Sequence, residues 1–190
     1  ASIGTGGETI ATGVITVEAN AEDDLFLVAV SLAGSGSTAV GLGASVLIFT
    51  NKVLAELGGN VQAGGDINVE ATSDEFLLNI AASLAGSGSV AVGGAAVVTY
   101  FTGKTIAKVL EDAVVEADGQ ITIQANSKEF ISADIVGLSG SGTAAVSGTV
   151  DVVITEVKTQ AYTENGVSIT AGNLSIEAID NYDFLGIAIS

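Results

Sequence analysis

Ile15-Thr16-Val17-Glu18-Ala19 is the stretch that decides the fold, because it returns three more times in the 190-residue chain. Its copies are Ile67-Asn68-Val69-Glu70-Ala71, Ile121-Thr122-Ile123-Gln124-Ala125 and Leu174-Ser175-Ile176-Glu177-Ala178. The spacing between first residues is 67 − 15 = 52, then 121 − 67 = 54 and 174 − 121 = 53. A unit of about 53 residues therefore occurs three times, with part of a fourth.

A second phrase, rich in glycine and serine, repeats with the first. Leu32-Ala33-Gly34-Ser35-Gly36-Ser37 returns unchanged at residues 84–89 and as Leu-Ser-Gly-Ser-Gly-Thr at residues 138–143. Units that repeat in this way usually contact only their neighbours. We expect residues 1–190 to form one elongated array, with repeat phrases starting near 15, 67, 121 and 174, and to be a piece of a longer protein.

Each opening phrase alternates apolar and polar residues, as a half-buried strand does. Ile67, Val69 and Ala71 would face inward, while Asn68 and Glu70 would face water. A glycine stands two residues before every copy, at positions 13, 65, 119 and 172. Because glycine tolerates positive φ, this offset predicts a recurring corner with that backbone conformation.

Acid-rich segments follow the phrases at residues 20–24, 72–75, 126–129 and 179–183, and we expect polar turns there. A phenylalanine comes next in each repeat, and the usual burial of this residue predicts a core or corner plug. These residues are Phe26, Phe76, Phe130 and Phe184.

The Gly-Ser-Gly phrase is expected to end one strand and to lead into a second, long one. One face of the second strand is apolar throughout, as in Val40, Leu42 and Ile48. The opposite face begins with small residues, at Gly41, Gly93 and Ser147 in successive repeats. Helical periodicity is nearly absent, and Gly, Val, Ile, Thr and Ser dominate, so the sequence predicts an all-β parallel solenoid.

Charge columns suggest how many coils one repeat makes. With one coil per repeat, Glu18 would lie over Glu70, and Lys52, Lys104 and Lys158 would stack at the strand spacing of about 4.8 Å. Two coils would double that distance and lower the repulsion per pair in water from about 0.9 to about 0.4 kcal/mol. We therefore expect two coils per repeat.

Composition excludes several classes of function. The net charge is −17 and all five basic residues are lysines, which opposes binding to nucleic acid and electrostatic binding to anionic membranes. There is no cysteine or histidine, so disulfides, thiolate metal sites and histidine-dependent catalytic triads are excluded within this chain. The sequence contains no run of about 18 apolar residues, so it does not predict a membrane-spanning helix.

The repeats resemble those of filamentous-haemagglutinin-type bacterial exoproteins, especially the leukotoxin-like filamentous adhesins. The resemblance is carried by Ala-Gly-Gly-Asp-Ile-Asn-Val-Glu-Ala at residues 63–71, by the Gly-Ser-Gly phrases and by the Ala/Val/Gly strands. It implies a right-handed parallel β-helix, export by a two-partner (type V) route, and a place at the bacterial cell surface or outside it. It also implies a role in adhesion and virulence, as a rigid stalk or contact surface. The expected partners are a protein or glycan receptor and the neighbouring repeats of the same protein.

Other functions remain open at this point. Acid clusters at residues 22–24, 74–75, 111–112 and 180/183 could bind Ca²⁺, but they match no known calcium loop, so solvated turns are the preferred interpretation. A membrane-perturbing toxin module is an alternative if the second apolar face, with Leu47, Phe49, Val97 and Phe101, is exposed. A polysaccharide-active enzyme is a weaker one, because its acid pair would occur once and not in every repeat. We predict no enzyme activity, and no catalytic, cofactor-binding or metal-binding residue.

Overall fold

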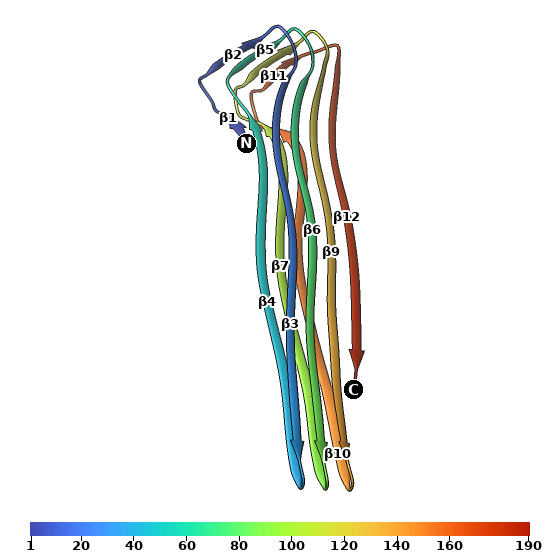
Figure 1. The fold of residues 1–190 in the computed structure, drawn as a ribbon. Coiled ribbons are helices and arrows are strands. Elements are labelled where there is room, and N and C mark those ends of the chain that lie inside the picture. Colours follow the sequence, from blue (N-terminus) through green and yellow to red (C-terminus); the bar gives the residue numbers. More distant parts are fainter.

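The computed structural model describes all 190 residues and shows a parallel β-solenoid, as predicted (Figure 1). The chain contains no helix, so none is available that is long and apolar enough to cross a membrane. The strands are β1 (Ser2–Ile3), β2 (Glu8–Ala11), β3 (Ile15–Ser35), β4 (Thr38–Leu57), β5 (Asn60–Ala63), β6 (Ile67–Ser87), β7 (Val90–Val109), β8 (Val114–Ala117), β9 (Gln120–Ser141), β10 (Ala144–Thr163), β11 (Ser168–Thr170) and β12 (Asn173–Ile189).

Three parallel sheets run along the stack, in the orders β1-β4-β7-β10, β11-β8-β5-β2 and β12-β9-β6-β3. Within a coil, a short strand such as β5 leads into a long strand, and the Gly-Ser-Gly phrase then reverses the chain into a second long strand. Figure 1 shows the two long sheets running side by side from a three-sided end to a row of narrow tips. We call the three-sided end the head. The blade is the remainder, residues 26–48, 76–100, 130–154 and 184–189.

The register of the strands confirms the repeat and corrects the number of coils. Ile15 pairs with Ile67, Ile67 with Ile121, and Ile121 with Leu174, so each repeat makes one coil. The expectation of two coils is wrong. It gave too much weight to repulsion between exposed charges, which at about 0.9 kcal/mol per pair is small and is screened by salt. Pairing over about twenty residues in each long strand outweighs it.

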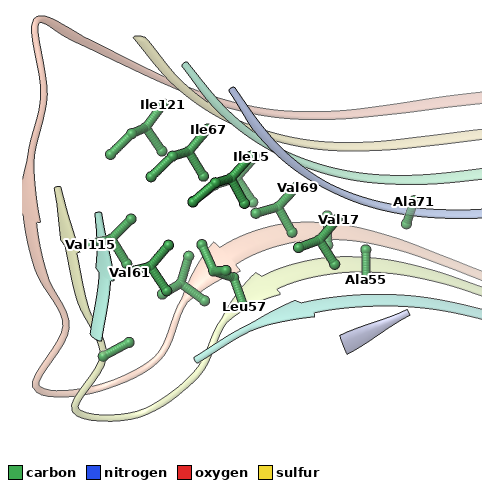
Figure 2. Packing of buried hydrophobic residues seen from close by; sticks show 14 of the residues in the cluster. Ile15, Val17, Ala55, Leu57, Val61, Ile67, Val69, Ala71, Val115 and Ile121 are labelled. Carbon is green, nitrogen blue, oxygen red and sulfur yellow. The ribbon is translucent and has the colours of Figure 1, made fainter. Parts of the chain in front are cut away.

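The head holds the main apolar core. Eighteen buried residues from all three sheets form it, chiefly isoleucine, valine and alanine. Figure 2 shows Ile15, Ile67 and Ile121 in one file, with Val61 and Val115 from the short strands nearby. The alternation of the opening phrase therefore places the expected side chains inside the solenoid.

The glycines that precede each phrase allow adjacent coils to pack closely, and they do not adopt the positive φ that the sequence predicted. Positive φ occurs once per coil at another corner, at Gly6, Gly59, Asp112 and Gly166, and not at the glycines before the phrase. A Cβ at Gly65 would lie 3.1 Å from the carbonyl carbon of Gly13 in the coil below. Glycine is thus favoured there because adjacent coils approach closely.

No turn interrupts the acid-rich segments. The long strands β3, β6, β9 and β12 run straight through them, so the prediction of polar turns is wrong. Acids in these segments alternate between the two faces: Glu75 is fully buried, and its neighbour Asp74 lies on the outside, half-exposed. This alternation places carboxylates inside the solenoid where head and blade meet, a level that we call the neck.

Candidate contact surfaces

Toward its tips the blade has its large side chains outside and its small ones inside, whereas nearer the neck Leu77, Ile131 and Ile135 are buried between the sheets. Gly41 and Gly93 face inward and are buried, whereas Val40 and Leu42 face outward and are 56% and 69% exposed. The head has the reverse arrangement. The apolar face of the second long strand is therefore an outer surface in the blade.

The small inner residues let the two long sheets approach closely. A Cβ at Gly93 would lie 2.7 Å from the carbonyl oxygen of Leu138, and one at Gly43 would lie 2.7 Å from that of Ala82. Sheets separated by ordinary side chains lie about 10 Å apart. The blade interior consequently has no room for leucine or isoleucine at these positions.

Polar side chains inside the blade bond to one another. Asn79 is fully buried and accepts a hydrogen bond from the Ser45 hydroxyl, and its amide donates to Thr99 Oγ1 at 2.9 Å. Ser83 donates to the Gly41 carbonyl at 3.2 Å. These bonds link opposite sheets, so the interior is held by polar contacts and small residues together.

The outer face of the blade begins with an aromatic ladder. The ring centroids of Phe26 and Phe76 are 5.4 Å apart, and those of Phe76 and Phe130 are 5.1 Å apart. Phe26 is 64% exposed, so the expectation of a core plug is wrong for these three rings, whereas Phe184 pairs with the buried Ile131 and has the inward parity. The three rings lie outside because the strand does not turn at the acidic segment and keeps its alternation.

The residues on which the membrane alternative rested face inward. Val97 and Phe101 are fully buried, and Leu47 is 9% exposed. Phe49 stacks on Phe101 with a centroid distance of 5.8 Å. The condition set for that alternative, exposure of this face, is therefore not met, and the residues of opposite parity form the exposed apolar surface.

Carboxylates form a column inside the neck. Glu75 pairs in register with Glu129, and both are buried. Ser73 Oγ donates to Glu75 Oε1 at 2.7 Å and Asn51 also donates to that oxygen, while Ser127 donates to Glu129. Burial raises the pKa of Glu75 and raises that of Glu129 to about 7, with the neighbouring Asp180 adding to the second shift.

This column makes stability depend on pH. The folded-state pKa of Glu129 is above the ordinary value of 4.5, so its contribution to stability is full below about pH 4.5 and is lost as the pH rises through about 7. We expect Glu129→Gln to raise the free energy of unfolding by about 2–3 kcal/mol at pH 8 and to have little effect at pH 4.5. Urea unfolding at both pH values measures this. Glu116→Gln, an exposed change in the same coil, is the control, and an equal gain at both pH values would contradict the assignment.

Ion pairs are confined to the outside of the head and the neck. Lys108 Nζ lies 3.1 Å from Glu56 and 2.8 Å from Glu164, and the Glu164 bond raises the lysine pKa. Lys128 bridges to Asp74 in the next coil at 3.0 Å. Lys52, Lys104 and Lys158 occupy adjacent strands as an outward ladder just above the blade.

The acid clusters considered for calcium are spread over different faces. Asp23 faces the interior beside Glu75, while Glu22 lies on the outer face. Glu111 and Asp112 form a turn, where the Glu111 amide donates to Glu164 at 3.0 Å. No three acidic side chains gather closely enough to hold a metal ion.

Searches against protein-family models, curated proteins and solved structures found no match to this chain.

Proposed function

We propose that the chain is a non-enzymatic contact segment of a large bacterial adhesin of the filamentous-haemagglutinin type, displayed at the cell surface. The observation that supports this best is the register of the coils. Each outward position repeats on the adjacent strand, as Lys52, Lys104 and Lys158 do, so one face offers a receptor the same group several times. Repeated weak contacts of this kind raise overall avidity without any single strong site.

The geometry favours a contact surface over a stalk. Coils stack about 4.8 Å apart, so each repeat of about 53 residues adds only about 5 Å of reach. A strand of twenty residues spans about 66 Å across the axis. The chain therefore uses its residues to build wide faces, which suits contact with a partner better than distance from the cell.

An enzyme acting on polysaccharides gains no support from the site geometry. Glu75 and Glu129, the acids whose pKa is raised by burial, face the interior of the neck. A sugar chain cannot reach them there. The outer acids Glu18 and Glu70 stack as a repeated ladder, which is not the paired arrangement that glycoside hydrolysis needs.

Cell binding by coated beads tests the adhesin proposal. Fluorescent beads that carry the chain should bind host epithelial cells several-fold better than beads with an unrelated protein of equal net charge. A triple variant, Lys52→Gln with Lys104→Gln and Lys158→Gln, should lower binding if the lysine ladder contributes, and Lys128→Gln is a control outside that ladder. Binding no better than that of the unrelated protein would overturn the proposal.

A further inference from the structure

We propose that the blade inserts into a lipid bilayer, with its strands along the membrane normal and the head left in water. This proposal does not rest on adhesion, because it concerns the apolar outer faces of the blade and not the charged ladders of the head. Four features carry it. They are the length of the apolar faces, the single charged residue on them, the residues at their boundary, and the presence of apolar surface on both sides.

The apolar faces match a bilayer in length. On β6 the outward residues from Phe76 to Gly86 are separated by ten steps, and on β7 those from Val90 to Tyr100 are separated by ten as well. At about 3.3 Å per residue each face spans about 33 Å. The hydrocarbon core of a bilayer is about 30 Å thick.

The second coil, which has neighbours on both sides, shows the composition of these faces. Its outward blade residues are Phe76, Leu78, Ile80, Ala82, Leu84 and Gly86 on β6, and Val90, Val92, Gly94, Ala96, Val98 and Tyr100 on β7. None of them is charged. Leu84 remains 48% exposed although strands flank it on each side. The faces are therefore open to a partner even within the array.

One acid interrupts the outer faces of the blade. Asp134 takes the position of Ile80 in the third coil, and Ser132 donates a hydrogen bond to it at 3.2 Å. A carboxylate on a lipid-facing surface opposes insertion. Its removal is for that reason a sensitive test of the proposal.

Aromatic and charged residues mark the head-side boundary on both faces. Asn51 contacts Glu75 across the interior, so their outward neighbours Lys52 and Asp74 lie at the same level on opposite faces. Phe76 follows directly on one face, and Tyr100 ends the apolar segment on the other. An aromatic ring followed by a lysine, as Tyr100 is by Lys104 on β7 and Phe130 is by Lys128 on β9, is typical of the interface between hydrocarbon and water.

The far end of the blade and the interior of its second coil also suit hydrocarbon, whereas the third coil has one inward acid, Asp151, whose pKa is raised by burial. The turns at residues 35–37, 87–89 and 141–143 contain only glycine, serine and threonine, so no charge has to cross. Strands β6 and β9 pair on both sides, as does β7, so the backbone groups of these inner strands are satisfied without water. The polar side chains of Asn79 and Ser83 are enclosed between the sheets.

A bilayer fits the blade better than a second copy does. A second blade could cover one apolar face but would leave the other in water, whereas lipid covers both at once. The net charge of −17 also opposes close packing of two heads. We therefore name lipid as the occupant, and self-association becomes an outcome of the test.

Single-cysteine labels test the orientation, because the chain has no cysteine of its own. Gly36 at the blade tip and Gly13 in the head have no heavy atom within 4 Å of an added Cβ, so cysteine fits at either place. Each variant would carry an NBD label, and dithionite, which does not cross the membrane, would be added outside phosphatidylcholine vesicles. We expect vesicles to slow reduction of the tip label at least fivefold and to leave the head label unchanged.

Each other result counts against insertion of the blade. A tip label that is equally accessible with and without vesicles would overturn the proposal. Protection of both labels by vesicles would indicate adsorption of the whole chain in another orientation. Protection of the tip without vesicles, increasing with protein concentration, would identify a second copy as the occupant.

Two matched lysine variants test the chemistry of the face. Val30 and Thr16 both point outward from β3 and are exposed, but only Val30, which is 72% exposed, lies in the blade. Val30→Lys should weaken partition into phosphatidylcholine vesicles roughly 30-fold, and Thr16→Lys should change it less than twofold. Asp134→Leu should strengthen partition several-fold. Equal partition of the two lysine variants, with unchanged circular dichroism, would contradict insertion.

Discussion

Replacing Gly93 with valine should lower the free energy of unfolding by about 3 kcal/mol, among the largest effects of any single change in this chain. The first added carbon would lie 2.7 Å from the Leu138 carbonyl oxygen and 3.4 Å from the Ser139 Cβ, both on the opposite sheet. A clash with backbone cannot be relieved by a rotamer change. The two sheets would have to separate, which would strain the contacts of Asn79 and Ser83 that join them.

Gly86→Val is the matched control for this prediction. Gly86 lies on the outer face of the same blade, and no heavy atom lies within 4 Å of a Cβ placed there. We expect this variant to change stability by less than about 0.5 kcal/mol. Urea unfolding followed by circular dichroism measures both, and equal effects would show that the small inner residues do not set the spacing of the sheets.

The fold could be predicted because the repeat is unambiguous. The phrase that begins at Ile15 returns at Ile67, Ile121 and Leu174, and the strands pair at those positions. Alternation within the phrase separates large apolar from polar residues, so the direction of each side chain in the head could be assigned. The number of coils per repeat could not be predicted from charge repulsion alone. Pairing of the long strands stabilises the stack of single coils by more than the repulsion between a few exposed charges destabilises it.

The two faces of the blade could not be assigned in the same way, because both are free of charge over most of their length. Hydrophobicity alone then places the larger residues, such as Leu42 and Ile48, inside. The physical constraint is the space between the sheets, which near the tips admits only small residues such as Gly41 and Gly43. A signal was present in the sequence: small residues alternate on both long strands at once, as at Ser83 and Ala85 on the strand that faces Gly41.

The column of acids in the neck was missed for a related reason. Consecutive acids such as Glu22, Asp23 and Asp24 are typical of a turn, because a strand with one face in the core would bury one of them. Here the strand continues, so Asp23 faces the interior while Glu22 and Asp24 remain exposed on the outer face. Burial raises the pKa of Glu75, and Ser73 and Asn51 donate hydrogen bonds that partly offset this rise, so the neck tolerates a carboxyl group that a core of the head type would exclude.

Truncation of Ile67 to alanine should lower the free energy of unfolding by about 3–4 kcal/mol. Ile67 is fully buried in the middle of the file shown in Figure 2, between Ile15 and Ile121. Coils above and below hold its neighbours in place, so the cavity cannot collapse easily, and a lost side chain in such a site costs more than its transfer from water alone. The head contains the large apolar cluster of the chain and should respond strongly.

Leu84→Ala is the matched control, because it removes a side chain of equal size from the same strand. Leu84 has the opposite parity, lies on the outer face of the blade and is 48% exposed. We expect a loss of at most about 1 kcal/mol in water, measured by the same urea unfolding. In phosphatidylcholine vesicles the order of importance reverses if the blade inserts: Leu84→Ala should weaken partition, whereas an Ile67→Ala chain that remains folded should keep it. Equal losses of stability for the two variants in water would contradict the assignment of Ile67 to the inside of the head and of Leu84 to the outside of the blade.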